Sequence, residues 1–126
     1  MAVEGETVEG LSLVISTDKP VYKVGEPIVL TLRLVSRTKG EMRLEFSDSQ
    51  RYDFVIRDSA GREVWRWSRD QVFAQVLGTE IIGPARAQLE FQTRFSGPLG
   101  QGVYRIEGSL PARGHRLSAT LTVQVR

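Results

Sequence analysis

Cysteine is absent from the 126 residues, and histidine occurs only once, at His115. Without cysteine the chain has no disulfide, no thiolate zinc site and no cysteine nucleophile. A serine triad needs a positioned imidazole base. His115 lies in "ARGHRL", between two arginines in an expected turn, where a solvated histidine is the simpler interpretation. These absences argue against nucleophilic and thiol chemistry.

Motifs for phosphate, metal and sugar chemistry are also missing. The stretch "GPLGQG" at 97–102 has three glycines but lacks the lysine of a P-loop and leads into an expected strand, so a hairpin turn explains it. Four carboxylates recur every five residues without forming a calcium loop or a paired-acid motif, namely Asp48, Asp53, Asp58 and Glu63. We therefore expect no catalytic residue, no metal site and no cofactor, in a protein that is not an enzyme.

Long apolar runs are lacking too, so no segment approaches the roughly 20 residues that a membrane helix needs, and no membrane partner is expected. The first ten residues carry three glutamates and no basic residue, unlike a secretion signal. We expect residues 1–10 to be a flexible acidic tip and residues 11–126 to form one domain in the cytoplasm. A leader already removed would instead indicate secretion or association with the cell envelope.

What the sequence does have is alternation of apolar and polar residues. In 28–36, Ile28, Leu30, Leu32 and Leu34 share one face, and in 88–95 the apolar face holds Leu89, Phe91 and Phe95. Similar segments, separated by turn signals such as "KVGEP", "DSAGR" and "PARGH", give about eight strands. This pattern predicts an all-β protein, an antiparallel Ig-like β-sandwich, with Tyr104 in "GVYRI" as its corner tyrosine.

The stretch "SRDQVFAQVLG" at 68–78 leaves two alternatives open. Ser68 is a suitable cap for a helix carrying Val72, Phe73, Val76 and Leu77, which Gly78 would end. A short turn followed by a strand fits equally well.

The two tryptophans of the chain stand in "GREVWRWSRD", where Trp65 and Trp67 share a strand face and Arg66 takes the other. Burying Arg66 without a partner would be costly, so we expect the rings to anchor the core with Tyr52, Phe54, Phe91 and Tyr104. The alternative is that the paired rings are exposed and face a partner.

Basic residues offer a further hypothesis. The outward positions of Arg33, Arg43 and Arg57 invite a basic sheet face that binds nucleic acid. The sequence shows neither a charge cluster nor exposed stacking aromatics beside them, so a solvated face and no nucleic-acid partner are expected.

Residues 49–77 resemble the bacterial intracellular proteinase inhibitor family, the BsuPI-like domains. The matching features are Gln50 before the aromatic–Asp–aromatic strand of Tyr52, Asp53 and Phe54, the Asp58-x-x-Gly61 turn, Trp65-x-Trp67-Ser68, and then Phe73 and Gln75. Flanking strands extend the likeness over nearly the whole chain. One departure is "IIGPARA" at 81–87, which replaces the family's Pro-Gly-Glu-like turn.

The resemblance implies an Ig-like domain that binds a subtilisin-type serine protease inside the cell and blocks it reversibly. For the binding end we expect Gln50, Arg51, Arg69, Gln71 and Phe73, although Gln50, Asp53 and Ser68 also suit a purely structural role in tying turns together. The alternative function is an Ig-like structural or accessory module with no protease target. Exposed edge strands permit dimerisation without predicting an oligomeric state.

Overall fold

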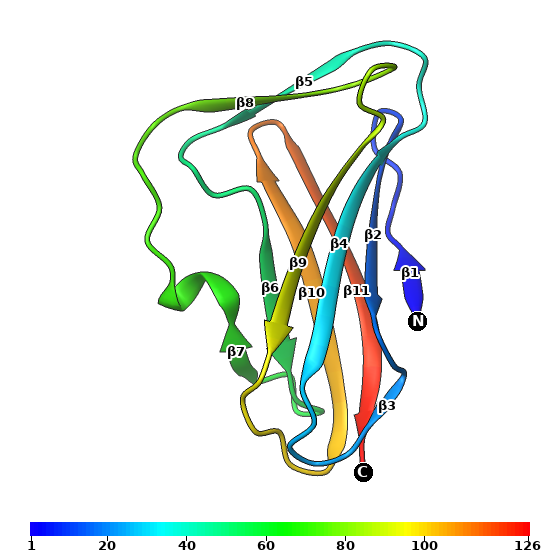
Figure 1. Cartoon of the computed structure of the whole chain (residues 1–126), viewed down its shortest axis with the longest axis vertical. Coiled ribbons are helices and arrows are strands. Elements are labelled where there is room, and N and C mark those ends of the chain that lie inside the picture. Colours follow the sequence, from blue (N-terminus) through cyan, green and yellow to red (C-terminus); the bar gives the residue numbers. More distant parts are fainter.

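The computed structural model describes the backbone of residues 1–126 and every side chain except that of His115. It is a β-sandwich of two facing sheets, with a small third sheet across one end (Figure 1). The first sheet has the order β1 (Ala2–Glu4), β2 (Leu11–Thr17), β4 (Ile28–Ser36) and β9 (Gln88–Phe95). The second has the order β3 (Val21–Tyr22), β11 (His115–Val125), β10 (Gly102–Ala112), β6 (Asp53–Arg57) and β7 (Glu63–Arg66). The third pairs β5 (Met42–Phe46) with β8 (Gly78–Ile82).

The sandwich forms because alternating aliphatic residues of both sheets meet in one core. In β4 the four predicted inward residues are at most 1% exposed, and in β11 the leucine and valine side chains alternate with exposed polar ones. All strand pairs are antiparallel except the two-residue β3–β11 pair. The predicted antiparallel sandwich is confirmed.

Tyr104 closes one corner of the sandwich, as predicted. Its ring is buried, and its hydroxyl donates a hydrogen bond of 3.0 Å to the backbone carbonyl of Gly100, four residues upstream. That geometry is typical of the tyrosine corner of Ig-like domains.

The acidic tip differs from expectation, because part of it is a strand. Ala2–Glu4 form β1, which pairs with β2, and the Met1 ammonium donates to the carbonyl of Thr17 at 3.0 Å. Val3 packs against the core as it does so. The tip thereby covers an edge of β2 that would otherwise present unpaired backbone groups.

Two more strands were not predicted, β3 and β8, and one predicted turn is shorter. The expected turn at 111–115 shrinks to Arg113 and Gly114, with Gly114 at a φ of 75° that favours glycine, because β10 and β11 pair as far as Ala112 and His115. The predicted solvated state of the His115 side chain lies outside the described part of the structure.

Tyr22 of β3 ties the 18–29 turn to the core. Its ring is buried, and its hydroxyl donates to the Asp18 carboxylate at 2.5 Å, which also accepts from the Val29 N–H at 3.1 Å. Burial, together with the negative Asp18, raises the pKa of Tyr22 to about 12. Burial opposes the charge of Asp18, but its hydrogen bonds outweigh that effect and lower its pKa.

Candidate functional site

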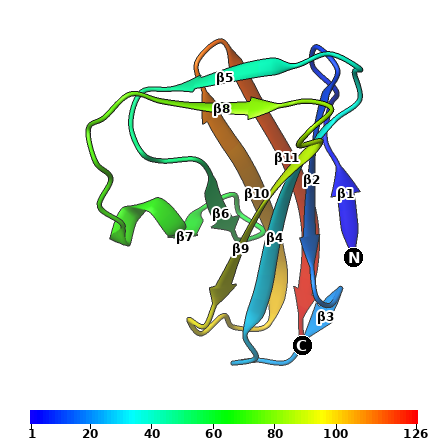
Figure 2. The same ribbon diagram turned by 45° about the horizontal axis from the view of Figure 1, so that its top comes forward.

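The chain leaves β7 through a short 3-10 helix, η1 (Trp67–Asp70), and then runs without turn or bend from Gln71 to Leu77 into β8. Neither alternative predicted for 68–78 is fully right, because no α-helix forms and the extended stretch precedes the strand. Both ribbon views show this connection arching along the outer side of the molecule, away from β2 and β11 (Figures 1 and 2).

Gln71–Leu77, called the η1–β8 segment below, exposes most of its apolar side chains. Val72 is 99% exposed, Leu77 71% and Val76 63%. A helix would have grouped these residues on one buried face. In the extended segment only Phe73 turns inward and is half-buried.

Two contacts hold the η1–β8 segment against the domain. Ser49, in the connection between β5 and β6, donates its N–H to the carbonyl of Ala74 at 3.0 Å, and its hydroxyl accepts from the Ala74 N–H at 2.8 Å. The Phe73 ring lies 5.8 Å from the Trp67 ring, centroid to centroid. The middle of the segment is therefore fixed while its apolar side chains face solvent.

A row of aromatic rings packs between the η1–β8 segment and the core. Trp67 stacks on Tyr52 at 4.2 Å between ring centroids, and Tyr52 stacks in turn on Phe91 of β9 at 4.8 Å. Trp65 of β7 packs against Phe95 at 4.9 Å. These rings bridge the two sheets on the side where β7 and β9 are the edge strands.

The predicted core aromatic residues differ in how deeply their rings are buried. Phe54 and Tyr104 are buried as expected. Tyr52, Trp65, Trp67 and Phe91 are only partly buried and pack against the core from its margin. These four rings are not fully enclosed, because the alternation identifies a shared face but not how far the opposite sheet covers it.

Hydrogen bonds between polar side chains connect η1 to β6. The Asp53 carboxylate, 7% exposed, accepts from the Ser68 hydroxyl at 2.6 Å, the Ser68 N–H at 3.0 Å and the Phe54 N–H at 2.9 Å. Arg66 adds a weaker contact to Asp53 at 3.4 Å. Ser68 therefore ties η1 to the sheet with its side chain and does not cap a helix.

Arg66 also pairs with Glu63, at 2.7 Å, and Arg69 reaches the same carboxylate. The hydrogen bond from Arg66 and the charges of Arg66 and Arg69 lower the pKa of Glu63. Arg66 thus has the ionic partners whose absence would have made its burial costly.

The five predicted binding residues divide into two groups. Gln50 and Arg51 serve the fold: Gln50 donates its amide N–H to the carbonyl of Tyr52 at 3.0 Å. Arg51 donates to the Asp48 carbonyl at 2.8 Å and lies 4.4 Å from the centre of the Phe46 ring.

Arg69, Gln71 and Phe73 lie together on η1 and the segment after it, with Arg69 and Gln71 exposed. The sequence interpretation missed the exposure of Val72, Val76 and Leu77, which it had placed on a possible helix face. Positions 72, 73, 76 and 77 fit the helical spacing, so the sequence alone carries no signal that identifies this exposure.

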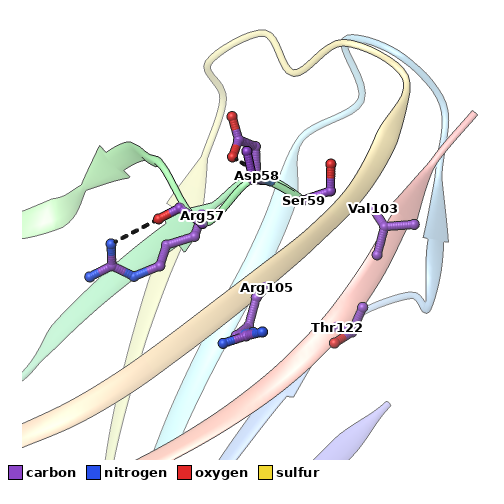
Figure 3. Close-up of a pocket in the computed structure, with 8 residues that line it drawn as sticks. Arg57, Asp58, Ser59, Val103, Arg105 and Thr122 are labelled. Carbon is purple, nitrogen blue, oxygen red and sulfur yellow. Dashed lines mark hydrogen bonds between the residues drawn. The ribbon is translucent and has the colours of Figure 1, made fainter.

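The hypothesis of one basic sheet face is wrong in geometry. Arg33, Arg43 and Arg57 stand on β4, β5 and β6, which belong to three different sheets. Figure 3 shows a hollow on the outer face of the second sheet where Arg57 lies opposite Arg105 of β10, beside the Asp58–Gly61 turn. This hollow lies apart from the η1–β8 segment.

The described residues contain no group of three or more His, Asp or Glu side chains arranged to hold a metal ion. No helix within the described chain has the length and apolar character required to cross a membrane.

Residues 15–115 match the sequence model of BsuPI, described as intracellular proteinase inhibitor. The chain belongs to the BsuPI family. The match runs from β2 to the start of β11 and includes the aromatic row, Asp53, Ser68 and the η1–β8 segment. No curated protein sequence matches the chain.

Solved structures share the fold of this BsuPI domain at low identity. They include sporulation control protein Spo0M from Bacillus subtilis (TM-score 0.59, 16% identity, 94% of this chain and 50% of that one). A Paenibacillus cycloisomaltooligosaccharide glucanotransferase follows (0.55, 17%, 88% and 13%). A CARDB domain from Pyrococcus furiosus matches along both lengths (0.51, 15%, 96% and 93%). The BsuPI domain thus spans half or less of the first two, and these likenesses concern the fold alone.

Proposed function

We propose that this BsuPI domain is a reversible protein inhibitor of an intracellular subtilisin-type serine protease, acting by binding and not by catalysis. The family's description supports a proteinase as the partner and the cell interior as the place. The serine type follows from the family resemblance of residues 49–77.

The observation that carries the proposal is the mounting of the η1–β8 segment. A protease cleft accepts an extended peptide, and an inhibitor must offer one that is exposed yet held in place. Gln71–Leu77 runs without turn or bend, is uncharged and mostly apolar, and is fixed at Phe73 and Ala74. Seven residues reach at most about 23 Å, a length that can centre an interface of the usual 1,200–2,000 Å² in total.

Titration of a subtilisin-type serine protease with the purified domain tests this proposal. We expect residual activity to fall linearly to near zero at one equivalent, with the domain still intact by mass spectrometry. A cysteine protease and a metalloprotease, titrated in the same way, serve as controls for class. Undiminished activity across several subtilisin-type enzymes would contradict the proposal and favour an accessory interaction module.

A further inference from the structure

We propose that the η1–β8 segment is the strand that enters the protease cleft, and that Val72 and Val76 are the side chains its pockets select. This inference rests on the proposed inhibitor function and names the surface and the class of protease involved. It follows from the directions of the side chains, the state of the backbone and the charge of the segment.

The side chains of an extended segment point alternately to opposite sides. Phe73 turns inward onto Trp67, whereas Val72, Ala74, Val76 and Leu77 are exposed. Among these aliphatic side chains Val72 is the most exposed, at 99%. Solvent gives these aliphatic groups no stabilisation, whereas a grouped exposed apolar surface is typical of an interaction site.

The backbone of the same segment has one occupied edge and one free edge. Ala74 uses both its N–H and its C=O on Ser49. In an extended chain the neighbouring residues direct these groups to the other edge. Across the described structure, no hydrogen bond engages the backbone of Phe73 or Gln75. The free edge is therefore available to pair with a strand of the cleft, as in peptide recognition by strand addition.

The composition of the segment indicates the class of protease. Residues 71–77, "QVFAQVL", contain no lysine or arginine and no acidic residue. A pocket that requires a cationic side chain would be left with an unpaired charge by valine. We therefore assign the domain to proteases that select apolar side chains, and not to those that cleave after lysine or arginine.

Rigid mounting explains why such a strand inhibits rather than being consumed. The Ser49 bonds and the Phe73–Trp67 contact order the segment before binding, which reduces the conformational entropy lost in the complex. Val72 and Val76 lie on either side of the tethered Ala74. A cut between them leaves the fragment that carries Phe73 packed on Trp67.

The decisive experiment measures inhibition constants for four variants on an apolar-selecting subtilisin-type protease. Val72→Asp and Val76→Asp place a carboxylate where an apolar pocket is expected, and we predict inhibition weakened at least about 100-fold for Val72→Asp. Val24→Asp is the control, because Val24 is 54% exposed in the turn after β3, and β3 lies on the opposite side of the molecule from η1 (Figure 1). The inhibition constant of Val24→Asp should equal that of the wild type, and that of Val72→Ile should lie within about threefold of it.

The outcomes separate the inference from the proposed function. If the wild type inhibits and both segment variants inhibit equally well, the inference is overturned and the inhibitor function stands. If the wild type fails to inhibit, both fall. If Val24→Asp weakens inhibition as much as Val72→Asp, the surface lies elsewhere. Stoichiometric inhibition of a protease that cleaves after lysine or arginine would contradict the assigned class.

A second measurement does not depend on the inhibition constants. Prolonged incubation with excess protease, followed by N-terminal sequencing, should place the first cut within Gln71–Leu77. Ser49→Ala removes the hydroxyl that accepts from Ala74, so that variant should be cut there at least about tenfold faster. A first cut outside the segment would overturn the inference.

Discussion

Replacing Trp67 by alanine tests the aromatic row as a stabilising element. A partly buried tryptophan removes roughly 120 Å² from water, which at about 25 cal/mol per Å² stabilises the fold by about 3 kcal/mol. The stack on Tyr52 at 4.2 Å and the contact with Phe73 contribute roughly 1 kcal/mol more. We therefore expect Trp67→Ala to lower the free energy of unfolding by about 4 kcal/mol, a large part of the 5–15 kcal/mol typical of a domain.

Thermal unfolding followed by circular dichroism measures this loss. At this chain length the entropy of unfolding is roughly 0.26 kcal/mol/K, so 4 kcal/mol corresponds to a fall in Tm of about 15 °C. Trp67→Phe, which keeps a ring in the row, should lose about half as much. Val64→Ala is the matched control, because Val64 is 43% exposed on β7 and should change Tm by about 2 °C or less.

The same variants separate a structural from a contact role for Trp67. Because Trp67 also holds Phe73, we expect folded Trp67→Ala to inhibit more weakly than the wild type and to lose its remaining inhibition together with folded protein as temperature rises. An unchanged Tm with lost inhibition would refute this reasoning and make the ring itself part of the interface.

Three further predictions concern single hydrogen-bonding groups. Ser68→Ala removes a 2.6 Å bond to buried Asp53, so the urea midpoint should fall by the equivalent of about 1.5–3 kcal/mol at constant m-value. Tyr104→Phe should lower the free energy of unfolding by about 1 kcal/mol in the same assay. An unchanged free energy would contradict a stabilising role for the Tyr104 hydroxyl. Tyr22 keeps its proton to about pH 12 when folded but only to about pH 10 unfolded, so stability should fall between these values. Tyr22→Phe should lack that alkaline slope, and a slope retained would assign it to other groups.

The strands were predictable because alternation reports directly which residues share a face. It located β4 and β9, and the glycine before Tyr104 identified the corner. The tip was missed because β1 forms only through pairing with β2, and its own three residues carry little periodicity.

The η1–β8 segment was not predictable because its conformation depends on distant residues. Alanine, glutamine and leucine suit a helix locally, but Ser49 and Trp67 hold the chain extended. Arg69, Gln71 and Phe73, which were expected at a binding end, lie next to the exposed valines, and their part in binding stays a prediction. The partly buried rings show that period alone does not determine depth.

The tether at Ala74 has a consequence for how such a domain diversifies. Its two hydrogen bonds use backbone atoms of Ala74, and the aromatic support comes from Trp67, so neither depends on the identity of residues 72 or 76. Mutations at those two positions should therefore change target choice at almost no expense in folding. Selection from a library randomised there would redirect one stable scaffold toward proteases with different pockets.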